Sequence, residues 1–178
     1  MVNPAKLAWG LARSAERRGA RIAEGSRVTG LRRRAGRVDV ETAGGGVVEA
    51  GHVLVGTSAY SAWLRRLAPA FVPVYDYVLM TEPLSEPQRA AIGWQRRQGL
   101  ADSANHFHYS RLTADDRILW GGYDAIYHFR SRVDPALEDR AATFDLLARQ
   151  LLETFPRLDG IRCTHRWAGV IDTSTRFT

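Results

Sequence analysis

The sequence has little lysine and cysteine, and it contains no long apolar run. Cys163 is the single cysteine, which excludes an internal disulfide and a thiolate metal site and predicts a small core residue. No apolar stretch approaches the ~18 residues that a membrane-spanning helix needs. The first residues also lack the unbroken apolar core of a secretory signal. These absences predict a cytoplasmic protein with no membrane span.

The shortage of lysine bears on the net charge of +6, because Lys6 is the single lysine among 25 basic residues. The arginines are spread along the chain, with one cluster at Arg32–Arg34 beside Arg37, where a hairpin tip is expected. The aromatic residues do not follow the pattern of an RNA-binding sheet. We therefore expect no nucleic-acid partner, although a basic nucleic-acid binder stays an alternative that salt-dependent binding would reveal.

A Gly-rich G-x-G-x-x-G phosphate loop is also missing. The first half nevertheless reads as part of a layered α/β domain. Asn3 and Pro4 predict the start of a helix that ends near Gly19. The pattern then predicts the following elements: a short strand at 20–25, an antiparallel meander at 26–50, a strand buried on both faces at 52–57, and a helix at 58–68.

The second half predicts an antiparallel sheet with flanking helices. Asp134 as N-cap and Pro135 at the first position predict a long helix that ends at Phe155, before Pro156. The other expected elements are a strand at 72–83, a short helix at 86–92, a hairpin at 106–124 and a final strand at 162–178.

Alternation in the hairpin places Tyr109 and Arg111 on one face, where an arginine beside aromatic residues could hold a substrate carboxylate. Alternatively, Arg111 is a solvated charge paired with Asp115 or Asp116. Histidines at spacing two, 106 and 108, lack a further ligand at matched spacing, so we expect no metal site.

Five segments of the sequence, in the order in which they occur along the chain, resemble those of a known family. They are "NPAKLAWGLARSAERRGARIAEGSRVTGL", "HVLVGTSAYSAWL", "PVYDYVLMTEPL", "RILWGGYD" and "FPRLDGIRCTHRWAGVIDTSTRF". Together they resemble FAD-dependent oxidoreductases of the D-amino-acid oxidase superfamily, in the gamma-glutamylputrescine oxidoreductase and glycine or sarcosine oxidase-like branch. The resemblance implies an α/β (α+β) fold: a partial FAD-binding domain of glutathione-reductase-like type at 1–68 and 166–178, and a substrate-binding domain at 69–165.

The resemblance also implies positions for the cofactor FAD. Val28 matches a backbone contact to the adenine, and "GTSAY" matches a strand-end motif that would lie along the pyrophosphate or ribose. In this sequence, the motif has Ser58 at the position where Gly or Asn is usual in the family. The implied cofactor-binding residues are Val28, Thr57, Ser58, Ala59, Trp167, Gly169, Asp172 and Thr173.

For the substrate, the resemblance implies that Tyr75 and Tyr77 line a pocket near the flavin, with ordinary aromatic core as the alternative. Tyr109 and Arg111 complete the expected substrate-binding set. The aromatic segment 123–129 is either a loop over the active site or an apolar plug beneath it.

The implied reaction oxidises a small amine or amino acid to an imine by hydride transfer to the flavin, which oxygen or another acceptor reoxidises. The resemblance identifies no catalytic residue. It also implies an internal fragment without the Gly-rich FAD loop and the last flavin segment. The alternative to an enzyme is a non-catalytic chain that needs a missing complement to bind FAD. The substrate and the oligomeric state are not implied.

Overall fold

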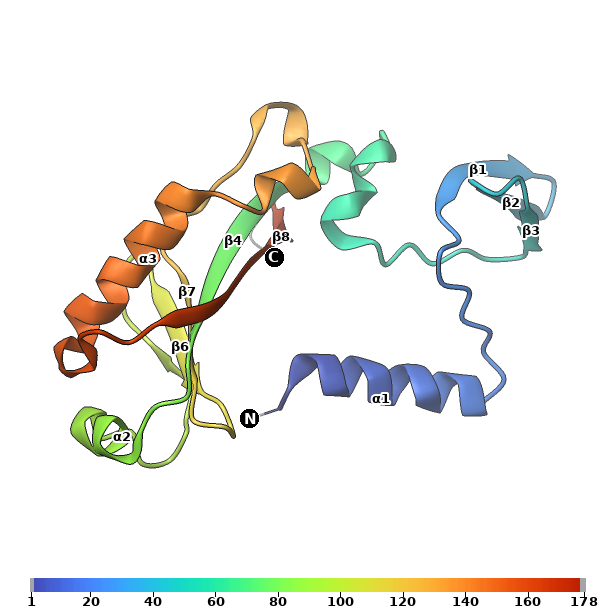
Figure 1. Ribbon diagram of the computed structural model, residues 1–178. Helices are drawn as coiled ribbons and strands as arrows, with labels where there is room; N and C mark the ends of the chain where they lie inside the picture. The colour runs from blue at the N-terminus through green and yellow to red at the C-terminus, as the bar shows by residue number, and fades with distance from the viewer. Residues whose placement is uncertain (1, 177–178) are drawn as a thin grey trace. The chain divides into compact units, whose positions relative to one another are not determined.

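The computed structural model describes residues 2–176, which form two compact units that divide between Gly56 and Thr57 (Figure 1). The predicted functional boundary, near residue 68, lies within the second unit. Assignment of the two predicted domains to cofactor and substrate stays a prediction. No helix among residues 2–176 is long and apolar enough to span a membrane.

The first unit contains helix α1 (Pro4–Arg17) and a three-stranded sheet in the order β1-β2-β3. The side chain of Asn3 accepts a hydrogen bond from the Lys6 amide at 3.1 Å, so the predicted N-cap is confirmed. The strands, β1 (Val28–Arg34), β2 (Arg37–Thr42) and β3 (Val47–Ala50), pair antiparallel and confirm the meander.

Charge on this small sheet is locally balanced. Arg32 binds Glu41 at 2.7 Å, and Arg37 binds Glu49 at 2.7 Å. Arg34 binds Asp39. The arginine cluster therefore pairs largely with acids of the neighbouring strands rather than presenting an unbroken basic surface.

Two predicted strands of the first half are wrong. Residues 20–25 are irregular, and residues 52–57 form no strand, with Leu54 97% exposed. A strand needs hydrogen bonds from a neighbouring strand, and the three-stranded sheet pairs only β1, β2 and β3. Without such a partner, this segment forms no strand and stays solvent-exposed although its sequence is apolar.

The helix predicted for 58–68 is also wrong. A 3-10 helix, η1 (Ser58–Trp63), ends where Leu64 adopts an extended conformation, and a second, η2 (Ala68–Ala70), follows. Ser58 has φ +46°, in the left-handed region that interrupts a right-handed helix. Two short 3-10 helices therefore replace the single helix predicted after the small-residue turn.

The second unit is built on a five-stranded antiparallel sheet in the order β5-β6-β7-β4-β8. Its strands are β4 (Phe71–Thr81), β5 (Leu100–Ala101), β6 (His108–Leu112), β7 (Ile118–Gly122) and β8 (Cys163–Ser174). The predicted hairpin is β6–β7, and the predicted final strand is β8 within the described residues; residues 177 and 178 lie outside them. Cys163, predicted in the core, is exposed at the first position of β8, where the register with β4 shifts.

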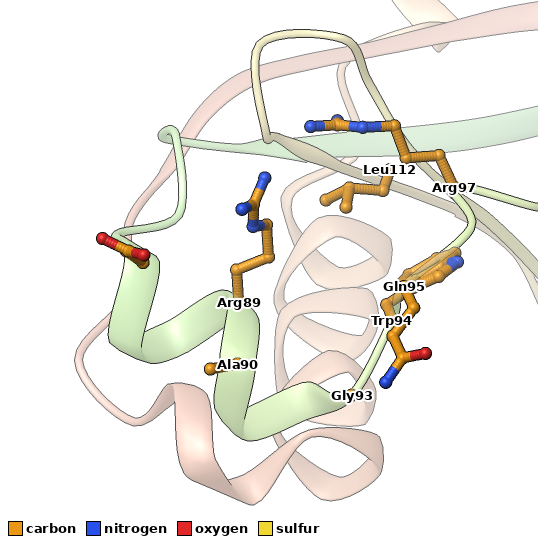
Figure 2. A pocket seen from close by; sticks show the side chains of 8 residues that line it. Arg89, Ala90, Gly93, Trp94, Gln95, Arg97 and Leu112 are labelled. Carbon is orange, nitrogen blue, oxygen red and sulfur yellow. The ribbon is translucent and has the colours of Figure 1, made fainter.

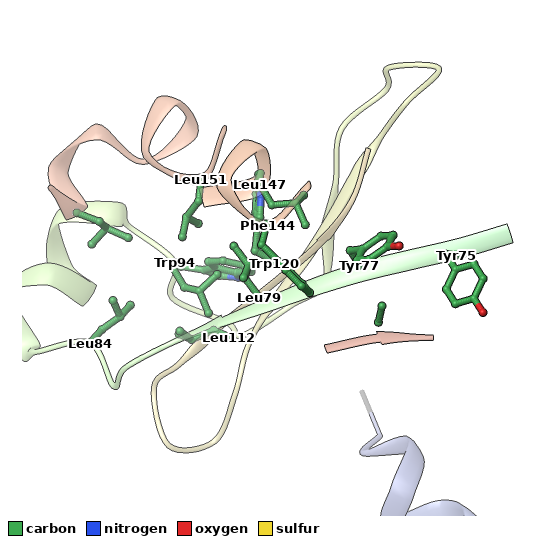
Figure 3. Packing of buried hydrophobic residues seen from close by; sticks show 13 residues of the cluster. Tyr75, Tyr77, Leu79, Leu84, Trp94, Leu112, Trp120, Phe144, Leu147 and Leu151 are labelled. Carbon is green, nitrogen blue, oxygen red and sulfur yellow. The ribbon is translucent and has the colours of Figure 1, made fainter. Parts of the chain in front are cut away.

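One face of this sheet carries the core. Helix α3 (Ala141–Thr154) packs across it (Figure 1). Its side chains Phe144, Leu147 and Leu151 belong to the buried cluster. Figure 3 shows the cluster between helix and sheet, which includes Tyr77, Leu79 and Trp120. Helix α2 (Glu86–Ile92) follows β4 with a Ser85 capping box and left-handed Gly93, which confirms its prediction.

The long helix predicted from Asp134 to Phe155 is interrupted. Asp134 caps only a 3-10 turn, η4 (Pro135–Leu137), and the α-helix begins after Arg140. The Tyr77 hydroxyl donates to the Leu137 carbonyl at 2.6 Å. That carbonyl would otherwise accept the amide of Ala141 in a continuous helix. A tertiary hydrogen bond therefore replaces a helical one at this break.

We expect Leu147→Ala to lower the free energy of unfolding by about 2–5 kcal/mol, because Leu147 is fully buried against the sheet. Leu54→Ala is the matched control, and it should change the free energy by less than about 0.5 kcal/mol. Urea denaturation measures both. A large loss at Leu54 would show that residues 52–57 are buried after all.

Candidate functional site

The candidate site lies on the face of the five-stranded sheet that points away from α3. Side chains alternate along β4, so Tyr75 and Tyr77 face α3, whereas Asp76 faces the other way. Cross-strand partners share a face, which places Gly169 beside Asp76 and Trp167 beside Val78. Trp167 and Ile171 of this face are exposed. We call this surface the open face.

A tyrosine–carboxylate pair lies on the open face. The Tyr109 hydroxyl, on β6, donates to Oδ2 of Asp76, on β4, at 2.5 Å. Burial raises the pKa of Asp76, although the hydrogen bonds from Tyr109 and from the Tyr77 backbone lower it in part. Burial also raises the pKa of Tyr109, and the neighbouring carboxylate raises it further. Tyr109 is therefore the proton donor in this pair.

Glycines shape the surface around this pair. A Cβ at Gly121 would lie 2.6 Å from the Tyr109 hydroxyl, so only glycine lets the Tyr109 ring lie flat against β7. A Cβ at Gly169, beside Asp76, would meet nothing within 4 Å. One glycine therefore positions Tyr109, and the other leaves open space next to the carboxylate.

A cavity of about 190 Å³ opens at this point. It lies where β7 ends at Gly122, before Ile126 forms an isolated bridge with Tyr75 of β4. Its walls combine the carboxylate pair with apolar side chains. Among its lining residues are Asp76, Phe107, Tyr109, Gly122, Tyr123 and Ile171.

The predicted substrate-binding residues separate into two groups. Tyr109 lines the cavity and Arg111 shares its face, but Arg111 lies outside the cavity lining. Tyr77 is core, with its hydroxyl on Leu137. Tyr75 borders the cavity, but its hydroxyl exchanges hydrogen bonds with the Asp134 backbone at 2.9 and 3.1 Å.

The acids proposed as partners of Arg111 are occupied by other arginines. Asp115 binds Arg117 at 2.8 Å, and Asp116 binds Arg89 at 3.1 Å. Arg97 binds Asp116 as well. The alternative reading of Arg111 as the partner of these two acids therefore has no support in the structure.

The predicted cofactor-binding residues are divided between the two units. Val28 begins β1 of the first unit, whereas Thr57, Ser58 and Ala59 begin the second. The Thr57 hydroxyl lies 2.7 Å from that of Ser61, and Ala59 is fully buried. The left-handed φ of Ser58 agrees with a position where glycine or asparagine is favoured.

The four predicted residues of β8 lie on both faces. Trp167, Gly169 and Thr173 belong to the open face, whereas Asp172, opposite Pro73, points to the other side. The structure thus places Gly169 opposite Asp76 and Trp167 opposite Val78 on the same face, but not Asp172. The role of all eight cofactor residues stays a prediction.

FAD fits these residues in part. The open space above Gly169, beside exposed Trp167 and Ile171, could receive a flat ring. The sequence supplies no Gly-rich loop for the pyrophosphate. No group of three or more His, Cys, Asp or Glu side chains within residues 2–176 is arranged to hold a metal ion.

Asp76 was missed as a site residue by the sequence reasoning. The available signal was a single acid inside the otherwise apolar and aromatic strand "VYDYV". The aromatic segment 123–129 contributes Tyr123 and Asp124 to the cavity wall, while Tyr127 and Phe129 are exposed.

A second pocket lies between α2 and the β6–β7 hairpin (Figure 2). Arg89 and Arg97 point into it, but both bind Asp116, and Arg97 also donates to the Thr113 carbonyl. With Glu86 also at the wall, the charges are balanced. These arginines fasten α2 to the hairpin.

The fold is shared with an oxidase and a dehydrogenase of known structure. Glycine oxidase from Geobacillus kaustophilus superposes with a TM-score of 0.75 at 19% identity, over 97% of this chain and 43% of that one. L-proline dehydrogenase from P. horikoshii gives 0.76 at 17% identity, over 98% and 45%. The mixed helix and antiparallel-sheet fold expected from the sequence is confirmed.

The family follows from the sequence itself. The model of the family "FAD dependent oxidoreductase" (DAO) matches residues 1–178, and the chain belongs to this family. Gamma-glutamylputrescine oxidoreductase of Escherichia coli is 34% identical over 170 residues, 94% of this chain. Sarcosine oxidase subunit beta of Rhodobacter capsulatus is 24% identical over 93% of the chain. The chain spans about 37% of the length of both relatives.

We expect Asp76→Asn to stabilise the fold at neutral pH and to flatten its pH dependence. Burial raises the pKa of Asp76 above its ordinary 3.8, so the folded chain holds this proton where the unfolded chain has lost it. The contribution of Asp76 to stability is therefore present below pH 3.8 and is lost as the pH rises through the raised pKa. Melting temperatures of wild type and Asp76→Asn, measured from below pH 3.8 to neutral pH, test this pH dependence.

Asp145→Asn, at an exposed position of α3, is the matched control, and it should reproduce the wild-type pH dependence. An equal pH dependence in wild type and Asp76→Asn would contradict the assignment of a raised pKa to Asp76.

Proposed function

We propose that the chain forms the substrate side of an FAD-dependent enzyme that oxidises an amine or amino acid to an imine. The observation that supports this best is the open face, where Asp76 and Tyr109 border a cavity next to open space at Gly169. Bound FAD would supply a hydride acceptor and pass the electrons to oxygen or another acceptor. A cytoplasmic location, from the single cysteine, belongs to the same proposal.

The chain's own residues have a positioning role in this proposal. Phe107 and Ile171 would contact the carbon skeleton of the substrate, and Tyr109 would hold the Asp76 carboxylate in a fixed orientation. Trp167 and Gly169 would border the flavin ring, and Thr57, Ser58 and Ala59 would lie along its phosphates or ribose. These roles draw on the family and on the shared fold.

We expect the chain purified alone to retain little FAD, since it lacks the phosphate loop. Co-expression with the part of the Escherichia coli relative that this chain does not cover should increase the flavin absorbance per mole of protein. Stoichiometric FAD in the chain alone would contradict the first expectation.

With FAD bound, anaerobic addition of an amine should bleach the flavin absorbance, and admission of oxygen or an artificial acceptor should restore it. A panel of monoamines, diamines and α-amino acids tests the proposed reaction. No bleaching by any of them would refute it.

A second candidate function is non-catalytic, and the apolar surface of the first unit favours it. Helix α1 buries none of its residues, and Leu7, Trp9, Leu11 and Leu54 are exposed. Burial of this surface would need a further apolar partner. On this reading, the chain is stable and binds FAD only in association with a complementing segment.

Size-exclusion chromatography and thermal melts, with and without the part of the Escherichia coli relative that this chain does not cover, separate the two candidates. Association that raises the melting temperature without any amine-dependent bleaching would favour the non-catalytic function. A monomer that bleaches without the added segment would exclude it.

A further inference from the structure

The cavity on the open face contains a carboxylate that lacks a cation. Within residues 2–176, no lysine, arginine or histidine nitrogen lies within 4.0 Å of the Asp76 carboxylate oxygens. Its hydrogen bonds come from one hydroxyl and one backbone amide. A partly buried carboxylate without a cation is costly, and a cationic ligand would offset this cost.

The other polar groups at the cavity do not supply that cation. Asp124 is already held by the Thr143 hydroxyl at 2.8 Å and by Arg140 at 3.4 Å. His106 packs edge-on against Tyr123. The titratable groups that face the cavity are Tyr75, Asp76, His106, Tyr109, Tyr123 and Asp124. The cavity therefore favours a cation over an anion.

The shape of the cavity specifies the cation further. Phe107 and Ile171 form apolar walls of the cavity that Asp76 lines. A compact ammonium group on an alkyl chain matches this combination, since its N–H groups can donate to the free Asp76 oxygen.

We propose that Asp76 binds a non-reacting ammonium group of the substrate, which makes the substrate a diamine or polyamine. The inference rests on the proposed amine oxidation. The reacting nitrogen must be neutral for hydride transfer, and a carboxylate in contact with an amine favours its charged form. The nitrogen at Asp76 is therefore the second one, and Asp76 sets specificity by positioning the far end of the substrate.

Direct binding tests this without FAD. Butylammonium, added to the 178-residue chain, should shift the carboxyl carbon resonance of Asp76, whereas butyrate and butanol should not. Asp76→Asn should weaken butylammonium binding at least tenfold, and Asp145→Asn should leave it unchanged.

The pH dependence gives a second readout. Binding to wild type should decline as the pH falls and Asp76 takes up its proton. His106 and Asp124 also face the cavity, so Asp76→Asn isolates the contribution of Asp76 by removing that carboxylate alone. Circular dichroism confirms that each variant is folded, and Tyr109→Phe, which should also weaken binding, replaces Asp76→Asn if the latter does not fold.

Equal binding of butanol and butylammonium, or unchanged binding in Asp76→Asn, would overturn the inference. In an FAD-loaded complex, Asp76→Asn should lower kcat/KM for 1,4-diaminobutane at least tenfold but not for butylamine. An equal decrease in kcat/KM for both amines would also overturn the inference. Absence of turnover with every amine, together with Asp76-dependent binding, would refute only the proposed oxidation.

Discussion

The second unit depends on the pairing of β4 along both of its edges. β8 follows it from Phe71 to Thr81, and β7 pairs with Val78–Met80 on the other edge, so this end of β4 has a neighbouring strand on both sides. This pairing fixes which side chains face α3 and which face away. A slip of one residue would exchange Tyr77 and Leu79 with Asp76 and Val78, and would place a carboxylate in the apolar core. The register of one strand thus determines both the stability of the unit and the chemistry of its open face.

The two faces of the five-stranded sheet have different roles. The face toward α3 is filled with large apolar side chains, and its tyrosine hydroxyls are used to hold the backbone at Asp134 and Leu137. The open face instead retains glycines, exposed aromatic side chains and a carboxylate with raised pKa. Such a surface costs stability, which is the usual trade-off where residues are kept for ligand binding. The contrast between these faces supports a binding role for the open one.

Local signals predicted much of the fold. The cap at Asn3 and the alternation around Tyr109 depend on neighbours in sequence, and the corresponding elements are present. The failures depended on distant partners. Residues 52–57 needed neighbouring strands, and the helix after Asp134 was broken by the Tyr77 hydroxyl from another strand. Likewise, Tyr109 was found from its strand, but its partner Asp76 lies on another strand, and only the tertiary fold joins them.

The pairing of β4 with β8 also has a consequence for how the chain folds during synthesis. Phe71 pairs with Ser174, so the sheet joins segments separated by almost the whole second unit. Contacts of such long sequence separation form slowly, because a large loop must close first. On the ribosome, the hairpin and α3 are made before β8 leaves the exit tunnel, and until then one edge of β4 is unpaired. The twelve residues of β8 therefore complete the sheet, and a delay in their pairing would leave an aggregation-prone edge exposed.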